Sequence, residues 1–301
     1  MKQGVYHVPV MLKEVLEGLK INPSGTYVDC TFGGGGHSLA ILELLNEKGR
    51  LVVFDQDETA KKNVPDDSRL VFIPHNFRHL QRFLRLHKIR FVDGIIADLG
   101  VSSHQFDVPE RGFSIRFDSP LDMRMDQKQE LTALKILRDY SEGRLHKLFE
   151  QFGEVTNSKT LARIIVQGRN SSPVNSIREF RNLVHSVVKG NPNRYFAQVF
   201  QALRIEVNDE FGALMEMLKQ VTEVLRPGGR IVIITFHSLE DRVVKKFYKT
   251  GTFEEVSDEL YGNKQKPPFI IITKKPLIPS PEEIEKNSRA RSAKLRIAER
   301  C

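Results

Sequence analysis

An alternation of short apolar runs with helical patterns across the first hundred residues constrains the fold more than any other feature of the sequence. The apolar runs, which predict β-strands, span residues 26–30, 51–54, 70–73 and 92–99. Residues 38–45 and 77–87 lie between these runs and carry apolar side chains at helical spacing. Apolar strands that alternate with helices are typical of a parallel sheet covered by helices on both faces. We therefore expect an α/β fold.

The alternation is interrupted in the middle of the chain. Residues 101–128 contain serines, prolines and glycines and predict a long irregular segment, and helical stripes follow at 161–165 and 177–190. Another helical stripe over 211–225 precedes a strand pattern at 231–236, and a short strand pattern at 269–273 follows two prolines, which favours a sheet edge. The sequence predicts one doubly wound domain formed by residues 1–105 and 204–301, with a mostly helical insertion at 106–203.

Positive charge is concentrated in two segments of the 301-residue chain. Its net charge is +8, but residues 157–203 alone carry +6 and residues 286–301 carry +5, which leaves −3 for the rest. A charge run is often a solvated face. Because the surplus lies in two blocks, we interpret them as candidate contacts to a polyanion such as RNA.

Composition excludes several other classes. With 40% hydrophobic residues the chain is not a disordered protein, and its two cysteines exclude a disulfide framework and a four-cysteine zinc site. The histidines lack ligand spacing, so no metal is expected. The apolar runs are too short to cross a bilayer and the N-terminus lacks a signal-peptide pattern, so we expect a cytoplasmic protein without membrane contact.

Four consecutive glycines, residues 33–36, follow the first predicted strand and precede a helix. Glycines at such a turn let a ligand approach the backbone, and the helix N-terminus adds a favourable field. Asp55 ends the second strand about twenty residues later, where a ribose-binding carboxylate is expected. A nicotinamide dinucleotide and S-adenosylmethionine both use this arrangement.

The glycine spacing favours S-adenosylmethionine. The strict G-x-G-x-x-G fingerprint of a dinucleotide is absent, because Ser38 and Leu39 stand where its third glycine would be. S-adenosylmethionine has no pyrophosphate and needs only the close approach. Asp29, before the glycines, also fits a cofactor with a cationic amino-acid end. A glycine turn without any ligand is the remaining interpretation.

Two further motifs end predicted strands at the same sheet edge, where ligands of open α/β sheets bind. Asp98 ends the fourth strand and supplies the first residue of the acidic-Pro-Pro-aromatic motif of amino methyltransferases, without the rest. A strand-end aspartate also commonly caps the next turn. After the fifth strand, Ser238 and Asp241 predict a helix N-cap box, and His237 lies at the same edge as Asp98.

Together these motifs resemble the bacterial ribosomal RNA small subunit methyltransferase H family, the 16S rRNA cytosine-N4 methyltransferases. The resemblance covers the chain nearly end to end and rests on His7 with residues 9–11, 29–38, 98–103 with Gln105, 110–114, 120–125, 200–205, 236–242 and 288–292. Gly34 departs from the family, because relatives often have arginine there. The resemblance implies a Rossmann-like class I methyltransferase fold, S-adenosylmethionine as cofactor and a cytoplasmic enzyme acting on small-subunit rRNA or a ribosomal particle.

The resemblance also implies site residues. The cofactor is expected at Gly35, Gly36, His37, Asp55, Phe77, Asp98 and Gln105. Phosphate contacts are expected from the arginines of the two basic blocks, Arg163, Arg169, Arg178, Arg181, Arg194, Arg289, Arg291 and Arg296. Position on the sheet supports Asp55 as the ribose ligand, and Phe77 suits adenine stacking or the anchoring of a helix. Gln105 has no sequence signal of its own.

The implied reaction is methylation of a cytidine amino group in the decoding region. Asp98 is the predicted acceptor for an amine N–H, in competition with its adenosine-binding role, and a backbone carbonyl within 99–103 is the alternative. Phe113 and Phe117 with Arg116 are candidates to receive the extruded base, or anchors of the long loop. A nicotinamide-dependent dehydrogenase and a non-catalytic RNA-binding assembly factor are the competing hypotheses.

Overall fold

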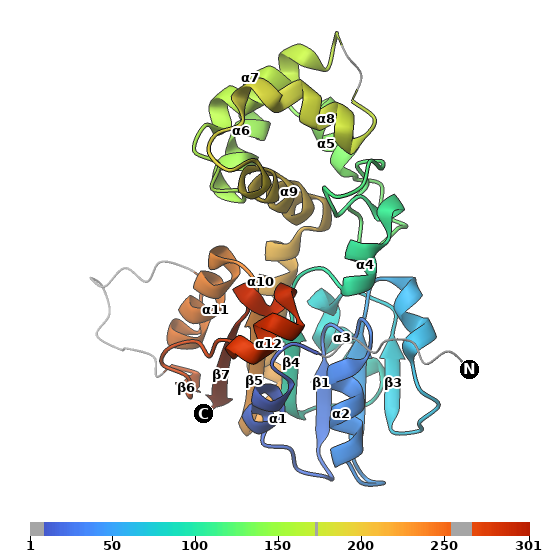
Figure 1. The fold of residues 1–301 in the computed structure, drawn as a ribbon. Coiled ribbons are helices and arrows are strands. Elements are labelled where there is room, and N and C mark those ends of the chain that lie inside the picture. Colours follow the sequence, from blue (N-terminus) through green and yellow to red (C-terminus); the bar gives the residue numbers. More distant parts are fainter. Residues whose placement is uncertain (1–8, 172–173, 254–266) are drawn as a thin grey trace. The chain divides into compact units, whose positions relative to one another are not determined.

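The computed structural model describes residues 9–171, 174–253 and 267–301 (Figure 1). The chain divides into two compact units, one formed by Met1–Gly100 with Gly212–Cys301 and the other by Val101–Phe211. The sequence predicts boundaries at residues 105 and 203, and helix α9 (Pro192–Asn208) runs without a break through the second of these. His7 of the N-terminal motif lies outside the described residues.

The first unit is built around a seven-stranded sheet with the order β3-β2-β1-β4-β5-β7-β6. Its strands are β1 (Thr26–Asp29), β2 (Arg50–Phe54), β3 (Leu70–Ile73), β4 (Val92–Asp98), β5 (Leu225–Thr235), β6 (Phe269–Ile271) and β7 (Lys294–Arg300). Strands β1 to β5 are parallel, which confirms the predicted α/β, Rossmann-like fold. The order reverses direction between β1 and β4, and this switch point is where such sheets bind ligands.

The sheet differs from the prediction at one side. The basic C-terminal segment forms β7, which inserts between β5 and β6 and is antiparallel to both. Strand β6 is at the edge, as its preceding prolines predict. Strand β5 begins at Leu225 and includes residues 227–229, which form an irregularity in its pairing with β4 and do not merely end the preceding helix.

Helices cover both faces of the sheet, which explains why its strands are apolar throughout. One core packs α3, α10 and α11 against side chains such as Val52 and Ile95, and the other packs α1, α2 and η5 against their neighbours Val53 and Ile96. The helices and 3-10 turns of this unit are α1 (Leu12–Leu19), α2 (Gly36–Leu44), η1 (Glu58–Asn63), η2 (Phe77–His79), α3 (Leu80–Leu86), α10 (Glu210–Val224), α11 (Ser238–Thr250), α12 (Pro281–Lys286) and η5 (Ser288–Ser292). The first two residues of α10 belong to the other unit.

The second unit is helical and has a core of its own. It contains α4 (Ser103–Asp107), η3 (Pro109–Arg111), α5 (Ala133–Asp139), α6 (Glu142–Gln151), α7 (Ser158–Gly168), α8 (Ile177–Val184), η4 (His185–Val187) and α9. The long segment between η3 and α5 is irregular, and a backbone bridge between Pro120 and Ser176 ties it to the start of α8. Among the described residues, no helix is both long and apolar enough to cross a membrane.

Candidate functional site

The glycine turn lies at the carboxyl end of β1 and begins helix α2. Gly35 is the N-cap of α2 with φ 82°, a left-handed conformation that favours glycine. A Cβ on Gly35 would also lie 3.1 Å from the ring of Phe32, and one on Gly36 would lie 3.0 Å from the ring of Pro9. A Cβ on Gly34 would meet no atom within 4 Å, so this position tolerates a side chain.

Asp29 fastens this turn to the sheet. Its side chain is 1% exposed, its Oδ2 accepts the Ser38 hydroxyl at 2.6 Å, and its Oδ1 accepts the Thr31 backbone N–H at 2.9 Å. A buried carboxylate needs such donors because it has lost its hydration. The structure therefore gives Asp29 a structural role, and its contact with a cationic cofactor end stays a prediction.

Asp98 ends β4 beside this turn and has one carboxylate oxygen without a hydrogen-bond partner among the described residues. Its backbone N–H donates to the Thr31 hydroxyl at 2.7 Å, which links it to the Asp29 network. Its Oδ2 lies 3.8 Å from Nδ1 of His37, whose Nε2 donates to the carbonyl of Val10 at 2.9 Å. Its Oδ1 is buried and has no hydrogen-bond partner within the described part of the chain. That oxygen is free to accept a hydrogen from a ligand.

Burial controls the charge of Asp98. Loss of hydration raises the pKa of this carboxyl from 3.8 to about 6; the nearby His37 opposes the rise, and the carboxylates of Asp29 and Glu240 add to it. With a pKa of about 6, the carboxyl group is mostly ionised at neutral pH, and a minor fraction is protonated. Such a perturbed carboxylate in a ligand-binding position is typical of functional sites.

Asp55 has a similar character at the end of β2. Its two oxygens accept the backbone N–H groups of Gly33 at 2.7 Å and of Asp57 at 2.8 Å, so the glycine turn and β2 are held together through it. Burial raises its pKa to about 6 against the lowering effect of these two hydrogen bonds. Phe77 follows β3 at the same sheet edge, starts η2 and is partly buried against the apolar core. The geometry of Phe77 is compatible with both sequence interpretations.

The segment after β5 corrects one sequence prediction. Helix α11 is capped by His237, whose side chain accepts the Glu240 backbone N–H, and not by a box of Ser238 and Asp241. Glu240 completes the cap, because its Oε2 accepts the backbone N–H of Phe236 at 2.9 Å. Asp241 is instead bound to Arg296 by two hydrogen bonds of 2.6 and 3.1 Å.

Gln105 and the loop aromatics belong to the helical unit. Gln105 is 5% exposed and forms a reciprocal capping box with Ser102 at the start of α4. Phe113 is 6% exposed within the core of this unit, which favours its role as a loop anchor, whereas Phe117 is 39% exposed. The guanidinium of Arg116 lies 5.8 Å from the ring of Phe106.

The arginines of the first basic block are mostly at the surface of the helical unit. Arg163, Arg178, Arg181 and Arg194 are exposed. Arg178 forms an ion pair with Asp118 at 2.6 Å, and such exposed pairs are weak and easily exchanged for a phosphate. Arg169 is partly buried and donates to the carbonyls of Leu137 and Tyr140, so it also fastens α7 to α5.

The second basic block is less available than the sequence suggests. Arg296 is 5% exposed within β7 and is neutralised by Asp241, so a phosphate contact would require breaking a buried pair. We therefore correct the prediction for Arg296, which has a structural role. Arg291 is exposed and Arg289 partly exposed, both within η5.

Sequence reasoning missed several residues that build this site. Thr31 bridges Asp29 and Asp98, and the Val10 carbonyl orients His37. No local signal marks the contact of Thr31 with Asp98 or that of His37 with Val10, because each joins residues that are distant in sequence. The structural role of Gln105 was readable from the spacing of Ser102 and Gln105, which matches a capping box.

Comparisons with known proteins agree with these motifs. The model of the MraW methylase family matches residues 4–301. Proteins named ribosomal RNA small subunit methyltransferase H are 53% identical in Bacteroides thetaiotaomicron, covering 98% of this chain and 97% of the relative, and 52% identical in Cytophaga hutchinsonii, covering 98% and 100%. A solved rRNA methylase from Streptococcus thermophilus is 12% identical with a TM-score of 0.40, covering 96% of this chain and 93% of that one. The chain belongs to the MraW methylase family.

Proposed function

We propose that this methylase transfers the methyl group of S-adenosylmethionine to the N4 amino group of a cytidine in the decoding region of small-subunit rRNA. The names of the relatives supply the ribosomal RNA substrate. The observation that carries the proposal is the partly buried carboxylate of Asp98 at the switch point of the sheet, whose Oδ1 has no hydrogen-bond partner among the described residues. A ribosomal RNA substrate supports a cytoplasmic location as part of this proposal.

The residues around Asp98 fit S-adenosylmethionine. Gly35 and Gly36 leave open the space that Cβ atoms would take at the glycine turn. The carboxylate of Asp55 keeps lone pairs for the ribose hydroxyls, since its two oxygens each accept one backbone hydrogen bond, from Gly33 and from Asp57. Phe77 offers a ring for adenine, and Nδ1 of His37 lies 3.8 Å from the carboxylate of Asp98. Gln105 stays in the proposed set through the family resemblance alone.

When bound, S-adenosylmethionine supplies a methyl group activated by its sulfonium. The cytidine amine is a weak nucleophile because its lone pair is delocalised into the ring. Asp98 accepts a hydrogen bond from one N–H, which returns electron density to the nitrogen, and takes the proton that the amine loses as it gains the methyl group. General-base assistance of this kind typically contributes about 10²–10⁴ in rate.

The RNA is proposed to lie on the exposed cations of both units. In the helical unit these are Arg163, Arg178, Arg181 and Arg194 with the partly exposed Arg169, and in the other unit Arg291 with Arg289. Arginine binds phosphate oxygens in a bidentate manner, and such contacts make affinity strongly dependent on salt. Methyl transfer to naked rRNA compared with transfer to assembled small subunits shows which of the two is the substrate.

Two alternatives make different demands on the site. Membership of a methylase family removes the reason for a nicotinamide-dependent dehydrogenase. A non-catalytic assembly factor would use the same basic surfaces, but it would need neither a partly buried carboxylate with an unpartnered oxygen nor the glycines of the turn. The state of Asp98 therefore favours the enzyme.

The test is methyl transfer from radiolabelled S-adenosylmethionine to purified small subunits and to naked small-subunit rRNA, followed by nucleoside analysis. We expect label in N4-methylcytidine with at least one of these substrates. A calorimetric titration accompanies it, and we expect binding of S-adenosylmethionine and none of NADH. Cofactor binding without methyl transfer to either substrate would support the assembly factor, and binding of NADH alone would overturn the proposal.

A further inference from the structure

A third basic segment lies in the unit that carries the sheet, outside the two basic blocks, where the rest of the chain has a net charge of −3. Between Arg69 and Arg90 the chain has six lysines and arginines and no acidic residue. This segment forms β3, η2, α3 and the turn that follows. It is separate from both basic blocks described above.

Most of these cations are exposed and unneutralised. Arg82, Arg85, Lys88 and Arg90 are exposed, and none of the four forms an ion pair with another residue of the described ranges. Arg78 is partly buried and lies 3.4 Å from Glu216. We name these five residues the α3 basic face. Like charges held together without carboxylates repel one another, and an anionic ligand relieves that repulsion.

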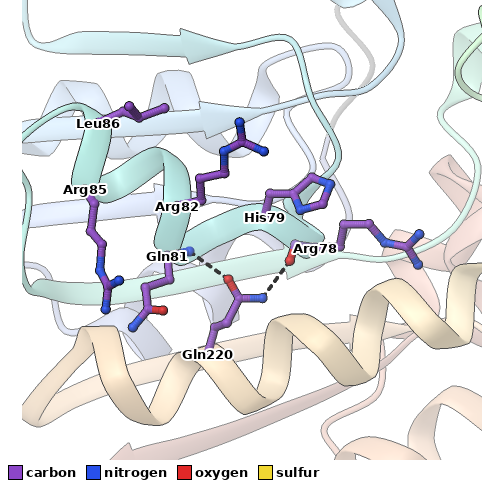
Figure 2. Close-up of a pocket in the computed structure, with 7 residues that line it drawn as sticks. All are labelled: Arg78, His79, Gln81, Arg82, Arg85, Leu86 and Gln220. Atoms are coloured by element: carbon purple, nitrogen blue, oxygen red, sulfur yellow. Dashed lines mark hydrogen bonds between the residues drawn. The ribbon is translucent and has the colours of Figure 1, made fainter.

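The face contains an open hollow of about 450 Å³, shown in Figure 2. Ligand pockets commonly measure about 300–1,000 Å³, so the hollow is large enough for a phosphate together with part of a nucleoside. Its walls combine cationic, amide and apolar groups. The lining residues are Arg78, His79, Gln81, Arg82, Arg85, Leu86 and Gln220.

Hydrogen bonds and core packing hold the backbone of η2 and α3, which carries these cations, in place. Gln220 of α10 accepts the backbone N–H of Gln81 at 2.8 Å and donates to the carbonyl of Arg78 at 2.6 Å, as the dashed lines of Figure 2 show. Leu80 and Leu84 of α3 are fully buried and pack into the core between α3 and the sheet. A surface that is already ordered loses less entropy on binding.

Apolar and aromatic groups are exposed among the cations. Leu86 is 66% exposed and Phe91 is 38% exposed, and the guanidinium of Arg90 lies 5.0 Å from the ring of Phe91. Single-stranded RNA is held by this combination, because cations bind its phosphates and aromatic rings or guanidinium planes stack on its bases.

We propose that the α3 basic face binds the phosphate backbone of the substrate RNA, which rests on the proposed function. Segment η2 begins at the carboxyl edge of the sheet, where Phe77 is a candidate cofactor residue, and α3 leads away from that edge. Seven helical residues extend about 10 Å. That length accommodates roughly two to three nucleotides of one strand at about 3.4 Å or more each.

The test is the binding of a fluorescent single-stranded fragment of small-subunit rRNA to the full chain as salt is varied. The triple variant Arg82→Gln, Arg85→Gln, Lys88→Gln removes three cations and leaves the candidate site intact. At about 0.7 per phosphate contact, the slope of log Kd against log salt should fall by about 2, and Kd should rise about tenfold. The matched control Lys13→Gln, Lys20→Gln, Lys48→Gln removes three exposed cations from α1 and the loop after α2, on the other face of the sheet. It should leave Kd and slope unchanged.

Two readouts separate this proposal from the proposed function. Both triple variants should bind S-adenosylmethionine like the wild type, which also shows that they are folded, and wild-type methyl transfer is measured in the same preparation. Unchanged RNA affinity and salt slope in the α3 variant would overturn the α3 proposal alone. Absence of methyl transfer by a wild type that binds cofactor would defeat the proposed function. Binding of the face to vesicles of anionic phospholipid, with no effect on RNA, would assign it to a membrane and also overturn the α3 proposal.

Discussion

Replacement of Asp98 by asparagine is expected to remove most methyl transfer and, at the same time, to stabilise the protein at neutral pH. Asparagine keeps the shape of the side chain but carries no charge and cannot take a proton. The loss of turnover should be about 10²–10⁴-fold if the carboxylate acts as the base. The gain in stability follows from the environment that raises the pKa of Asp98.

The size of that gain can be worked out from the pKa. The carboxyl pKa rises from 3.8 to about 6, and each unit corresponds to about 1.4 kcal/mol. A group whose pKa is raised on folding contributes stability below its unfolded pKa and loses it as pH rises through the folded value. At pH 7.5 the wild type therefore carries a penalty of up to about 3 kcal/mol that the asparagine variant lacks. By pH 5 the difference falls to roughly half.

The assay combines thermal or urea unfolding at pH 7.5 and pH 5 with methyl transfer across the same range. The variant should show a Tm several degrees higher at pH 7.5, since a unit of this size gains about 2–4 °C per kcal/mol. The wild-type rate should fall as pH drops through about 6, because the base becomes protonated, and the residual rate of the variant should be flat there. A variant that is less stable at pH 7.5, or one with near-normal turnover, would refute the reasoning.

Three further predictions follow from other contacts. Asp55→Asn should weaken S-adenosylmethionine binding about 10- to 100-fold, because a charged hydrogen bond is worth about 1.5–3 kcal/mol, and wild-type affinity measured by calorimetry should fall as pH drops through about 6, where Asp55 becomes protonated. Gly35→Ala should lower the free energy of unfolding by about 1–2 kcal/mol, because residue 35 has a left-handed backbone, and it should also weaken the binding of S-adenosylmethionine. Gly34→Ala should leave the free energy of unfolding nearly unchanged in the same urea melt, and equal effects of the two variants would contradict the structure. Arg296→Ala should lower the free energy of unfolding by about 1.5–3 kcal/mol, because the partly buried Asp241 loses two charged hydrogen bonds and keeps only Lys294 at 3.9 Å, whereas Arg291→Ala should leave the Tm unchanged and weaken RNA binding.

The part of the fold that could be predicted is the part buried on both faces. Residues 51–54 and 92–98 read as strands because neighbouring side chains enter opposite cores, so every position is apolar or small except at the strand ends. Asp55 and Asp98 could be found for the same reason, since a carboxylate that ends such a strand is conspicuous. What the pattern could not supply was the cross-connection through Thr31, which depends on the distance between two strand ends and not on local sequence.

The C-terminal segment shows how charge can mislead. Residues 294–300 alternate polar and apolar side chains, which is the pattern of a strand, and Leu295 and Ile297 are buried on one face of β7. The positive charge of the segment favoured an RNA-binding tail over that pattern. Arg296 can lie in the sheet because Asp241, distant in sequence, neutralises it.

Counting charges along the sequence therefore does not locate an RNA-binding surface. It can include cations that are paired within the fold, and it can miss cations that remain available. In the C-terminal block, Arg296 is paired with the carboxylate of Asp241. The segment from Arg69 to Arg90 keeps four exposed cations without an ion-pair partner among the described residues, although the chain outside the two basic blocks has a net charge of −3. Availability depends on whether folding brings a carboxylate to each cation, and that pairing is set by tertiary contacts. The effect of each arginine on the salt dependence of RNA binding should accordingly follow its exposure and its ion pairs, not its place in a basic stretch of sequence.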